Sequence, residues 1–322
     1  MPSLWACPQK LLDIEMINVI SVIICTYNPN ADRLNKTLNG LRLQGFPLQN
    51  WELIIVDNDS KTPIIVDLKW HPSARIVKEP KPGLTRARIK GFTEAKGEII
   101  LMVDDDNVLD QNYLQNCSDI FDKYPKLGAI GGNILPDFET IPPEWTKQFW
   151  GSLALRTLEK KIQLTDFSGI KITHYPSFAP VGAGMAIRNI ALEKYMANMA
   201  NGENVIQDRS GNKLTSSGDN EIVMQIMLNG FEAGFFPQLQ LNHLIPPDRF
   251  TKNYLGKLNQ GIMSSWTAFL IKYQICPWKR FPKYLLWPRL IKAYLKYKPW
   301  QNEKNLVTYK GIKGQLQALA EN

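Results

Sequence analysis

Short apolar runs alternate with amphipathic stretches over the first third of the chain, and each run stops abruptly at polar residues. The apolar runs, which are rich in β-branched residues, cover 18–28, 51–60, 74–80 and 98–103. Continuous runs of this kind are typical of strands that are buried on both faces. Residues 31–44 and 83–97 lie between them and have helical spacing, the second stretch ending on Gly97. Strands that alternate with helices predict βαβ units, and therefore an α/β fold with a mainly parallel sheet.

The pattern is less regular after residue 127. Another apolar run covers 127–135, and 182–196 predicts a Gly-rich turn, a short strand and a helix. Residues 217–230 predict a helix that Gly230 ends, and its apolar positions are Ile222, Val223, Ile226 and Met227. We expect two short strands and a Pro-rich exit in 231–249. Residues 136–180 fit no single element, and we expect them to form the second wall of a cleft.

Charge separates a C-terminal region from the rest of the chain. The protein carries 38 Lys and Arg against 30 Asp and Glu, a net charge of +8. Eleven of the basic residues lie between Arg249 and Asn302, where there is no Asp or Glu and where Trp and Tyr are frequent. We therefore predict one domain over 1–250 and a helical, basic and aromatic region over 251–322, each with its own partner.

Composition also limits the cellular setting. The 322 residues are 44% hydrophobic, enough for one large core with an appended subdomain. The sequence shows neither a signal-peptide pattern near its start nor an apolar run of about 18 residues. Four scattered cysteines without C-x-x-C spacing argue against a zinc site and against a disulfide framework. We expect a cytoplasmic protein that can lie on the inner face of a membrane.

Three adjacent carboxylates end the run at 98–103. Asp104, Asp105 and Asp106 repel one another and cannot enter a core unpaired. Such a triplet can form a solvated turn with a helix cap. A divalent cation relieves the repulsion more simply, and hard oxygen ligands at the carboxyl edge of a parallel sheet suit Mg²⁺ or Mn²⁺ with a phosphorylated substrate. A calcium loop of the EF-hand type fits poorly, because Leu109 and Gln115 stand where Gly and Glu are required.

The phosphate-binding motifs of other nucleotide enzymes are missing. The sequence contains no G-x-x-x-x-G-K-[ST], and no G-x-G-x-x-G follows a predicted strand. This argues against kinase-like, ATPase and dinucleotide-dependent enzymes. A nucleotide diphosphate held by a metal and by ordinary loops remains, and nucleotide-sugars fit that description.

Six motifs in order resemble family 2 of the inverting glycosyltransferases, which have the GT-A fold. They are SVIICTYN, ELIIVDNDS, GLTRARIKGFTEAKGEIILMVDDDN, GAGMAIR, SGDNEI and HLIPPDR, and the resemblance covers about residues 17–250. Each motif is weak alone, but six at plausible spacing are specific. The resemblance implies a GT-A type mixed, mainly parallel sheet flanked by helices.

The resemblance also implies roles at the nucleotide. Asp57 would contact the base, with Thr26 and Asn28 in the same loop region, and Arg88 would lie near the base and diphosphate. Ile89 stands where the family has Asn, which removes one polar contact. From the residues alone, Asp57 can also be a turn residue, and Arg88 a surface charge on its helix.

The stretch VDDDN matches the family's D-x-D signature. By this resemblance Asp106 would ligate the metal directly, and Asp104 would face the ribose or a metal-bound water, with Asp105 beside the nucleotide. His243 and Arg249 match an H-x-x-x-x-x-R pattern, in which His approaches the metal and Arg meets the diphosphate. A lone histidine can equally be structural.

Transfer to an acceptor hydroxyl needs a base for its proton. Asp219 matches the Asp of the family's acidic E-D motif, with Gly218 in place of the usual Glu, and Glu221 is the alternative acid. Asp219 can also be a helix N-cap. Gly182 and Gly184 allow a close approach of the backbone, for binding or for packing.

We therefore predict a metal-dependent, inverting glycosyltransferase that moves a sugar from a nucleotide-sugar, most simply a UDP-sugar, in surface or extracellular polysaccharide assembly. The Q-x-x-R-W motif of processive synthases is absent, so we expect transfer of single residues. The expected partners are a saccharide or lipid-linked glycan acceptor and an anionic membrane surface contacted by residues 278–300. A sugar-phosphate nucleotidyltransferase and a non-catalytic carbohydrate-binding protein are the alternatives; the acidic cleft argues against nucleic acid.

Overall fold

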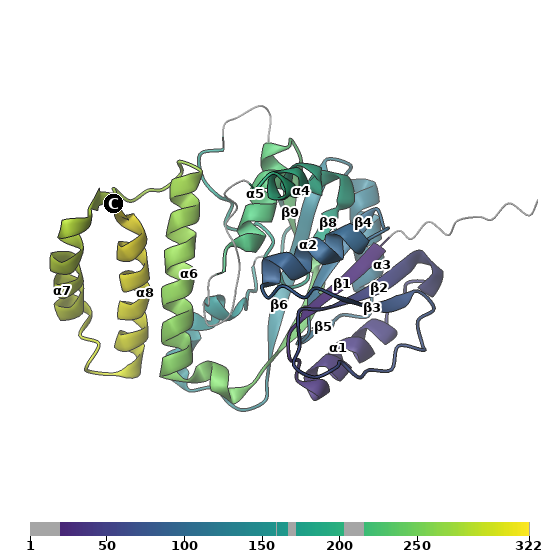
Figure 1. The fold of residues 1–322 in the computed structure, drawn as a ribbon, viewed down its shortest axis with the longest axis horizontal. Helices are drawn as coiled ribbons and strands as arrows, with labels where there is room; N and C mark the ends of the chain where they lie inside the picture. The colour runs from purple at the N-terminus through teal and green to yellow at the C-terminus, as the bar shows by residue number, and fades with distance from the viewer. Residues whose placement is uncertain (1–19, 159, 167–171, 203–215, 322) are drawn as a thin grey trace, which may run out of the picture.

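The apolar runs of the first third form the parallel half of a sheet (Figure 1). The computed structural model describes residues 20–158, 160–166, 172–202 and 216–321. Strands β1 (Ile20–Thr26), β2 (Trp51–Asp57), β3 (Ala74–Lys78) and β4 (Ile99–Asp104) pair in parallel in the order β3-β2-β1-β4. β1, β2 and β4 are buried along almost their whole length, as the continuous apolar runs predict.

The sheet continues beyond β4 with strands of both directions. β8 (Ala186–Arg188) pairs antiparallel with β4 and with β6 (Leu127–Phe138), and β9 (Glu232–Ile245) runs parallel to β6. Two short strands, β5 (Asn107–Leu109) and β7 (Gln163–Leu164), pair antiparallel with β9. Within the described ranges the sheet has nine strands and is mixed, which confirms the predicted fold class.

Helices cover both faces of the sheet because successive strand residues point to opposite sides. Val22 and Ile24 share one core with α1 (Ala31–Arg42) and α3 (Tyr113–Lys123). Ile23 shares the other core with α2 (Leu84–Glu94), α4 (Glu193–Ala200) and α5 (Gly218–Leu228). The four apolar positions predicted for the helix at 217–230 are all buried in that second core. Short 3₁₀ segments lie at η1 (Leu48–Asn50), η2 (Glu144–Leu153), η3 (Asn189–Leu192), η4 (Pro247–Phe250) and η5 (Lys283–Leu285).

Residues 232–245 form one long strand, β9, so the prediction of two short strands is wrong, whereas the Pro-rich exit expected after them is present at the start of η4. Pro237 indicated a break, because proline cannot donate a ladder hydrogen bond. The strand continues past it because the pairing with β6 shifts between Gly131 and Asn133, whose partners are Phe235 and Gln240. Residues 236–239 thus leave the regular ladder, and the bulge accommodates the proline.

Helix α2 ends before the glycine that was expected to end it. Its last residue is Glu94, and Ala95 already has extended backbone angles. Gly97 instead lies against β1, where its N–H donates to Ser21 Oγ at 2.8 Å. A Cβ on Gly97 would lie 2.6 Å from Ser21 N, so this glycine serves close packing of two backbones.

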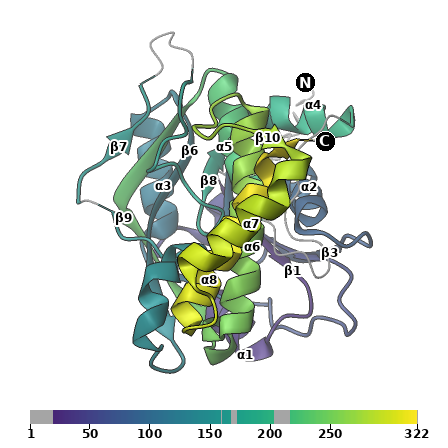
Figure 2. The ribbon, with the colours of Figure 1, turned by 90° about the vertical axis from the view of Figure 1, so that its left-hand side faces the viewer.

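Three helices follow η4 and lie to one side of the sheet (Figures 1 and 2). They are α6 (Lys252–Lys272), α7 (Leu286–Tyr297) and α8 (Glu303–Leu319); α8 packs between α6 and α7. Two short strands, β10 (Phe281–Pro282) and β11 (Ala320–Glu321), pair in parallel beside them. Leu255 and Leu258 of α6 join the core of the sheet, so the division at residue 250 stays a prediction. No helix in the described ranges has the length and apolar character needed to cross a membrane.

A buried histidine lies at the edge of the core, far along the chain from the three aspartates. His71 is 3% exposed, and its ring packs edge-on against Trp51 with 4.1 Å between ring centroids. Its Nδ1 accepts a hydrogen bond from Ser73 N at 3.1 Å, which fixes the proton of the neutral ring on Nε2. Burial lowers the pKa of His71 to about 4, although the charge of Glu52 opposes the shift.

This pKa shift makes the stability of the fold depend on pH. The unfolded chain binds a proton at His71 near pH 6.5, whereas the folded chain resists it until about pH 4. The free energy of unfolding should therefore fall as the pH is lowered through this window, by about 1–2 kcal/mol between pH 7 and pH 5. In His71→Asn, the amide oxygen can still accept from Ser73 N. Urea titrations of this variant should show that the free energy of unfolding depends less steeply on pH between pH 7 and pH 5. An unchanged slope in this variant would contradict the assignment.

Candidate active site

The carboxyl ends of three parallel strands meet at one edge of the sheet. Thr26 at the end of β1 is in register with Asp57 at the end of β2, and Cys25 is in register with Asp104 at the end of β4. Parallel strands all release their loops at the same edge, which is where α/β sheets bind ligands. The structure therefore brings these loops together.

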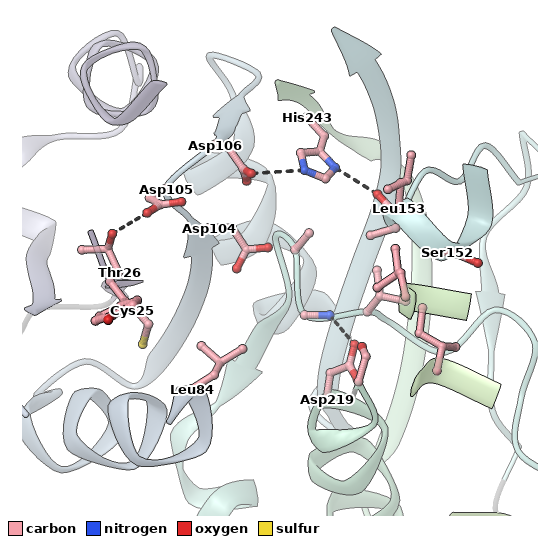
Figure 3. Close-up of a pocket in the computed structure, with 18 of the residues that line it drawn as sticks. Cys25, Thr26, Leu84, Asp104, Asp105, Asp106, Ser152, Leu153, Asp219 and His243 are labelled. Carbon is pink, nitrogen blue, oxygen red and sulfur yellow. Dashed lines mark hydrogen bonds and ion pairs between the residues drawn. The ribbon is translucent and has the colours of Figure 1, made fainter. Parts of the chain in front are cut away.

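A cavity of about 550 Å³ opens at this edge (Figure 3). Its walls come from seven parts of the chain: the end of β1, Asn58 after β2, residues 82–88, residues 104–106, residues 151–154, residues 181–183 with the start of α5, and residues 243–262. Its size is that of a site for a molecule such as a nucleotide conjugate. Among the sequence-predicted residues, Thr26, Arg88, Asp104, Asp105, Asp106, Asp219, His243 and Arg249 line it.

The turn that carries the three aspartates is fixed by a buried asparagine. Asn107 is fully buried, its Oδ1 accepts from Asp104 N at 3.3 Å, and its Nδ2 donates to Asp106 Oδ1 at 3.3 Å. Thr26 Oγ1 donates to the carboxylate of Asp105. Burial and the neighbouring charges of Asp106 and Asp104 raise the pKa of Asp105 to about 6, against the effect of the Thr26 hydrogen bond. The turn therefore holds its carboxylates close together despite their mutual repulsion.

Strand pairing places His243 beside Asp106. His243 of β9 is in register with Asn107 of β5, and its Nε2 lies 3.4 Å from Asp106 Oδ2 (Figure 3). Its Nδ1 lies 3.0 Å from the carbonyl oxygen of Leu153. Burial opposes charge on both side chains, but the contact between them outweighs it, so the pKa of His243 is raised and that of Asp106 is lowered. Arg249 also lowers the pKa of Asp106.

These residues fit part of a binding site for Mg²⁺ or Mn²⁺. Asp104 and Asp106 offer hard oxygen ligands, and Nδ1 of His243 donates to the carbonyl of Leu153, so Nε2, which faces Asp106, is the ring nitrogen that could ligate a metal once it has lost its proton. No three His, Cys, Asp or Glu residues in the described part of the chain are grouped closely enough to hold a metal alone. The donor set is therefore that of a site whose remaining ligands are substrate phosphates and water.

Asp219 is held apart from the three aspartates, at the start of α5 (Figure 3). Its Oδ2 accepts from Gly182 N and its Oδ1 from Asn220 N, both at 2.9 Å. A Cβ on Gly182 would lie 2.7 Å from Arg88 Nη2 and 3.6 Å from Asp219 Oδ2, so the missing side chain lets Arg88 and Asp219 approach the same loop. The N-terminal turn of α5 also favours the ionised carboxylate.

Glu221 does not line the cavity. It is fully buried, and its Oε1 accepts from Lys272 Nζ at 2.5 Å and from Tyr273 Oη at 2.7 Å. This ion pair joins α5 to α6 through Oε1, while Oε2 is buried without a hydrogen-bond partner in the described part of the chain. The geometry therefore favours Asp219 over Glu221 as the acid that faces a substrate.

Two other predicted residues do not line the cavity. Asn28 has a left-handed backbone (φ 48°), and its Oδ1 accepts from Lys61 N, which ties the loop after β1 to the loop after β2. Asp57 is buried, and its Oδ1 accepts from Ser60 N at 2.9 Å. Neither lines the cavity in this conformation, whereas Asn58 does.

Gly184 serves packing. Its φ is +73°, and Tyr113 Oη donates to its carbonyl oxygen at 2.6 Å. A Cβ at this position would lie 2.5 Å from Leu241 Cδ2, so only glycine fits.

Sequence reasoning missed one wall of the cavity. Tyr254, Leu258 and Ile262 of α6 line it, although α6 belongs to the region predicted to be separate. These residues follow ordinary helical spacing, so nothing in the sequence distinguishes them from core positions. Residues 151–154 line it as well, in agreement with the second wall expected from 136–180.

The fold and the site together define an α/β protein with a cavity at the carboxyl ends of its parallel strands and acidic residues in that cavity. Residues 21–195 match the sequence profile of glycosyl transferase family 2, which is more than half of the chain. The protein therefore belongs to glycosyltransferase family 2, and the family resemblance seen in the sequence is confirmed.

Two curated relatives match over shorter stretches. The glucosyl-dolichyl phosphate glucuronosyltransferase of Haloferax volcanii is 24% identical over 131 residues, 39% of this chain and 41% of the relative. The poly-beta-1,6-N-acetyl-D-glucosamine synthase of Staphylococcus epidermidis is 28% identical over 123 residues, 37% of this chain and 29% of the relative. The matched region thus spans less than half of either relative.

Two solved structures share the fold over most of the chain. TarS 1–349 of S. aureus in complex with UDP-GlcNAc has a TM-score of 0.50 and 15% identity, and the match covers 93% of this chain and 90% of TarS. GalNAc-T7 with UDP, GalNAc and Mn²⁺ also has a TM-score of 0.50, with 16% identity, covering 82% of this chain and 52% of that one. At such identity the likeness shows the fold alone.

The site geometry predicts that metal binding depends on Asp106. In Asp106→Asn, one charged oxygen ligand is lost at the end of a strand, and His243 loses its ion-pair partner. Mn²⁺ titrations followed by electron paramagnetic resonance, in the presence of UDP, should show affinity weakened about tenfold or more. Asp137→Asn removes the same charge from an exposed position outside the cavity and should bind Mn²⁺ like the wild type. Equal affinity in Asp106→Asn would rule out this metal site.

Proposed function

We propose that this protein is a metal-dependent, inverting glycosyltransferase that moves one sugar from a UDP-sugar to a hydroxyl group of a glycan acceptor. The arrangement of charge in the cavity carries this proposal. Asp104, Asp106 and His243 are grouped at one place, and Asp219 is held separately by Gly182 N at 2.9 Å. Two separate carboxylate positions suit a reaction that must hold a diphosphate and deprotonate a hydroxyl.

The donor would lie with its diphosphate at the aspartate turn. A bound Mg²⁺ or Mn²⁺ would supply charge stabilisation to the departing diphosphate. Arg88 and Arg249, which line the cavity from opposite elements, would contact phosphate oxygens as the negative charge develops. UDP-GlcNAc in the TarS structure and UDP with Mn²⁺ in the GalNAc-T7 structure support this choice of donor and metal for a chain of the same fold.

Asp219 would act as the base. The acceptor oxygen attacks C1 of the sugar, the bond from C1 to the phosphate oxygen breaks, and the electron pair leaves with UDP. The hydroxyl proton passes to the Asp219 carboxylate, whose Oδ2 the Gly182 N–H holds in place. One displacement of this kind inverts the configuration at C1, and it requires no covalent intermediate on the protein.

The acceptor would be a saccharide or a lipid-linked glycan in polysaccharide or cell-surface glycan synthesis. Apolar residues of α6, Leu258 and Ile262, form one wall of the cavity and would contact the apolar face of a sugar ring or the lipid end of such an acceptor. The missing Q-x-x-R-W motif supports transfer of single residues. An acceptor in a membrane would place the enzyme on the cytoplasmic face, where anionic lipids are its neighbours.

The assignment of the base predicts a specific loss of rate. Asp219→Asn keeps an oxygen that can accept from Gly182 N, but it cannot take a proton. The rate of UDP release in the presence of a supplied acceptor should fall about a hundredfold or more. The affinity for UDP-sugar, measured by calorimetry, should stay nearly unchanged.

A second variant separates the base from its structural neighbour. Glu221→Gln breaks the buried ion pair with Lys272, so it should lower the thermal midpoint of unfolding more than it lowers the transfer rate of the folded enzyme. If Glu221→Gln lost the transfer rate while Asp219→Asn kept it, Asp219 would not be the base.

A further inference from the structure

An apolar face of α7 is left uncovered at the outer edge of the molecule (Figure 1). Leu290 and Ala293 are the buried residues of this helix, and it packs on α8. Trp287, Ile291 and Leu295, which are spaced four residues apart, are 74%, 58% and 60% exposed. Residues at this spacing lie on one face of a helix, so these three form a continuous strip that points away from α8.

Aromatic residues extend this strip at both ends. Tyr284, in η5 just before the helix, is 77% exposed. Tyr294 and Trp300 are also exposed, and their ring centroids lie 5.0 Å apart. Isolated apolar side chains on a surface are common, but a contiguous strip of large ones is characteristic of a surface that binds a partner.

Positive charge surrounds the strip. The basic residues on η5, on α7 and directly after it are all exposed: Lys283, Arg289, Lys292, Lys296 and Lys298. The chain contains no Asp or Glu between Arg249 and Asn302. A partner that accepts both large apolar groups and positive charge fits this surface.

We propose that α7 is an interfacial helix that docks the enzyme on an anionic lipid bilayer. Trp287, Ile291 and Leu295 would enter the boundary between headgroups and acyl chains, and Tyr284 and Trp300 would lie at headgroup level. The lysines around the strip would contact anionic headgroups, each contributing about 1 kcal/mol that salt screens. This proposal rests on the proposed function in one respect only: docking would bring the cavity to an acceptor that lies in the membrane.

The shape of the region supports a surface contact over a deeper insertion. α7 has 12 residues, too short to cross a bilayer, and charged residues interrupt its apolar positions. Only one side of the helix is apolar and exposed, since the other side packs on α8. A helix of this kind lies in the plane of the membrane and leaves the sheet and its cavity outside it.

Sedimentation of the full-length protein with vesicles tests this proposal without any sugar donor. Vesicles of phosphatidylglycerol and phosphatidylcholine at low salt should carry the protein down, and phosphatidylcholine vesicles or molar salt should release most of it. A variant with Trp287→Gln, Ile291→Gln and Leu295→Gln should lower the partition coefficient about tenfold or more. A variant with Lys283→Gln, Lys292→Gln and Lys296→Gln should also lower the partition coefficient about tenfold or more. Its vesicle binding should depend less on the salt concentration.

Matched controls come from exposed residues elsewhere on the chain. Leu43, Ile65 and Ile141 are 72%, 89% and 96% exposed and lie outside α7, so their change to Gln should leave vesicle binding intact. Changing the exposed Lys36, Lys61 and Lys69 to Gln controls for total charge. Thermal unfolding and UDP release in solution should be unchanged in both α7 variants, since α7 contributes no residue to the cavity.

Three results would overturn the proposal. The first is that the wild type does not bind vesicles, or that the α7 variants bind them as well as the wild type does. The second is equal binding to neutral and anionic vesicles. The third is a dimer, seen by analytical ultracentrifugation and lost in the apolar variant, which would make the strip an interface between two copies. Loss of glycosyl transfer in Asp219→Asn bears only on the proposed function, so the two proposals fail separately.

Discussion

The repulsion among three adjacent carboxylates is the constraint that shapes this site. Asp104, Asp105 and Asp106 follow a buried strand, and each must be compensated because none can reach bulk water freely. The fold supplies a different partner for each part of the turn. Thr26 donates a hydrogen bond to Asp105, His243 pairs with Asp106, and Asn107 accepts from the backbone N–H of Asp104. The compensation comes from strands β1, β9 and β5, so the site exists only when the whole sheet is assembled.

The register of the strands determines which residues lie beside these carboxylates. The pairing of Asn107 with His243 puts a histidine from residue 243 beside a carboxylate from residue 106. The carbonyl of Leu153 then orients the ring from a third segment. A slip of one residue in β9 would turn His243 to the other face of the sheet, so the regular ladder and the bulge at 236–239 both protect the site.

Helix α5 links this cavity to the C-terminal helices. Its first turn presents Asp219 to the cavity, while Glu221, two residues later, pairs with Lys272 of α6. Residues two apart on a helix point in different directions, so one short segment faces a substrate on one side and anchors a neighbouring helix on the other. Helix α6 also lines the cavity with Tyr254, Leu258 and Ile262. Helix α8 packs on α6, and α7 packs on α8.

The sequence by itself determined the α/β class, the parallel strands that deliver CTYN and VDDDN to one edge, and the family. It could do so because buried parallel strands are apolar along their whole length, and abrupt polar ends mark where they stop. Only the tertiary structure decided that 232–245 is one strand, that Glu221 forms an internal ion pair, that Asn28 and Asp57 do not line the cavity, and that α6 does. Each of these depends on a contact between residues far apart in the chain, and local patterns of polarity carry no information about which distant residue will be the partner.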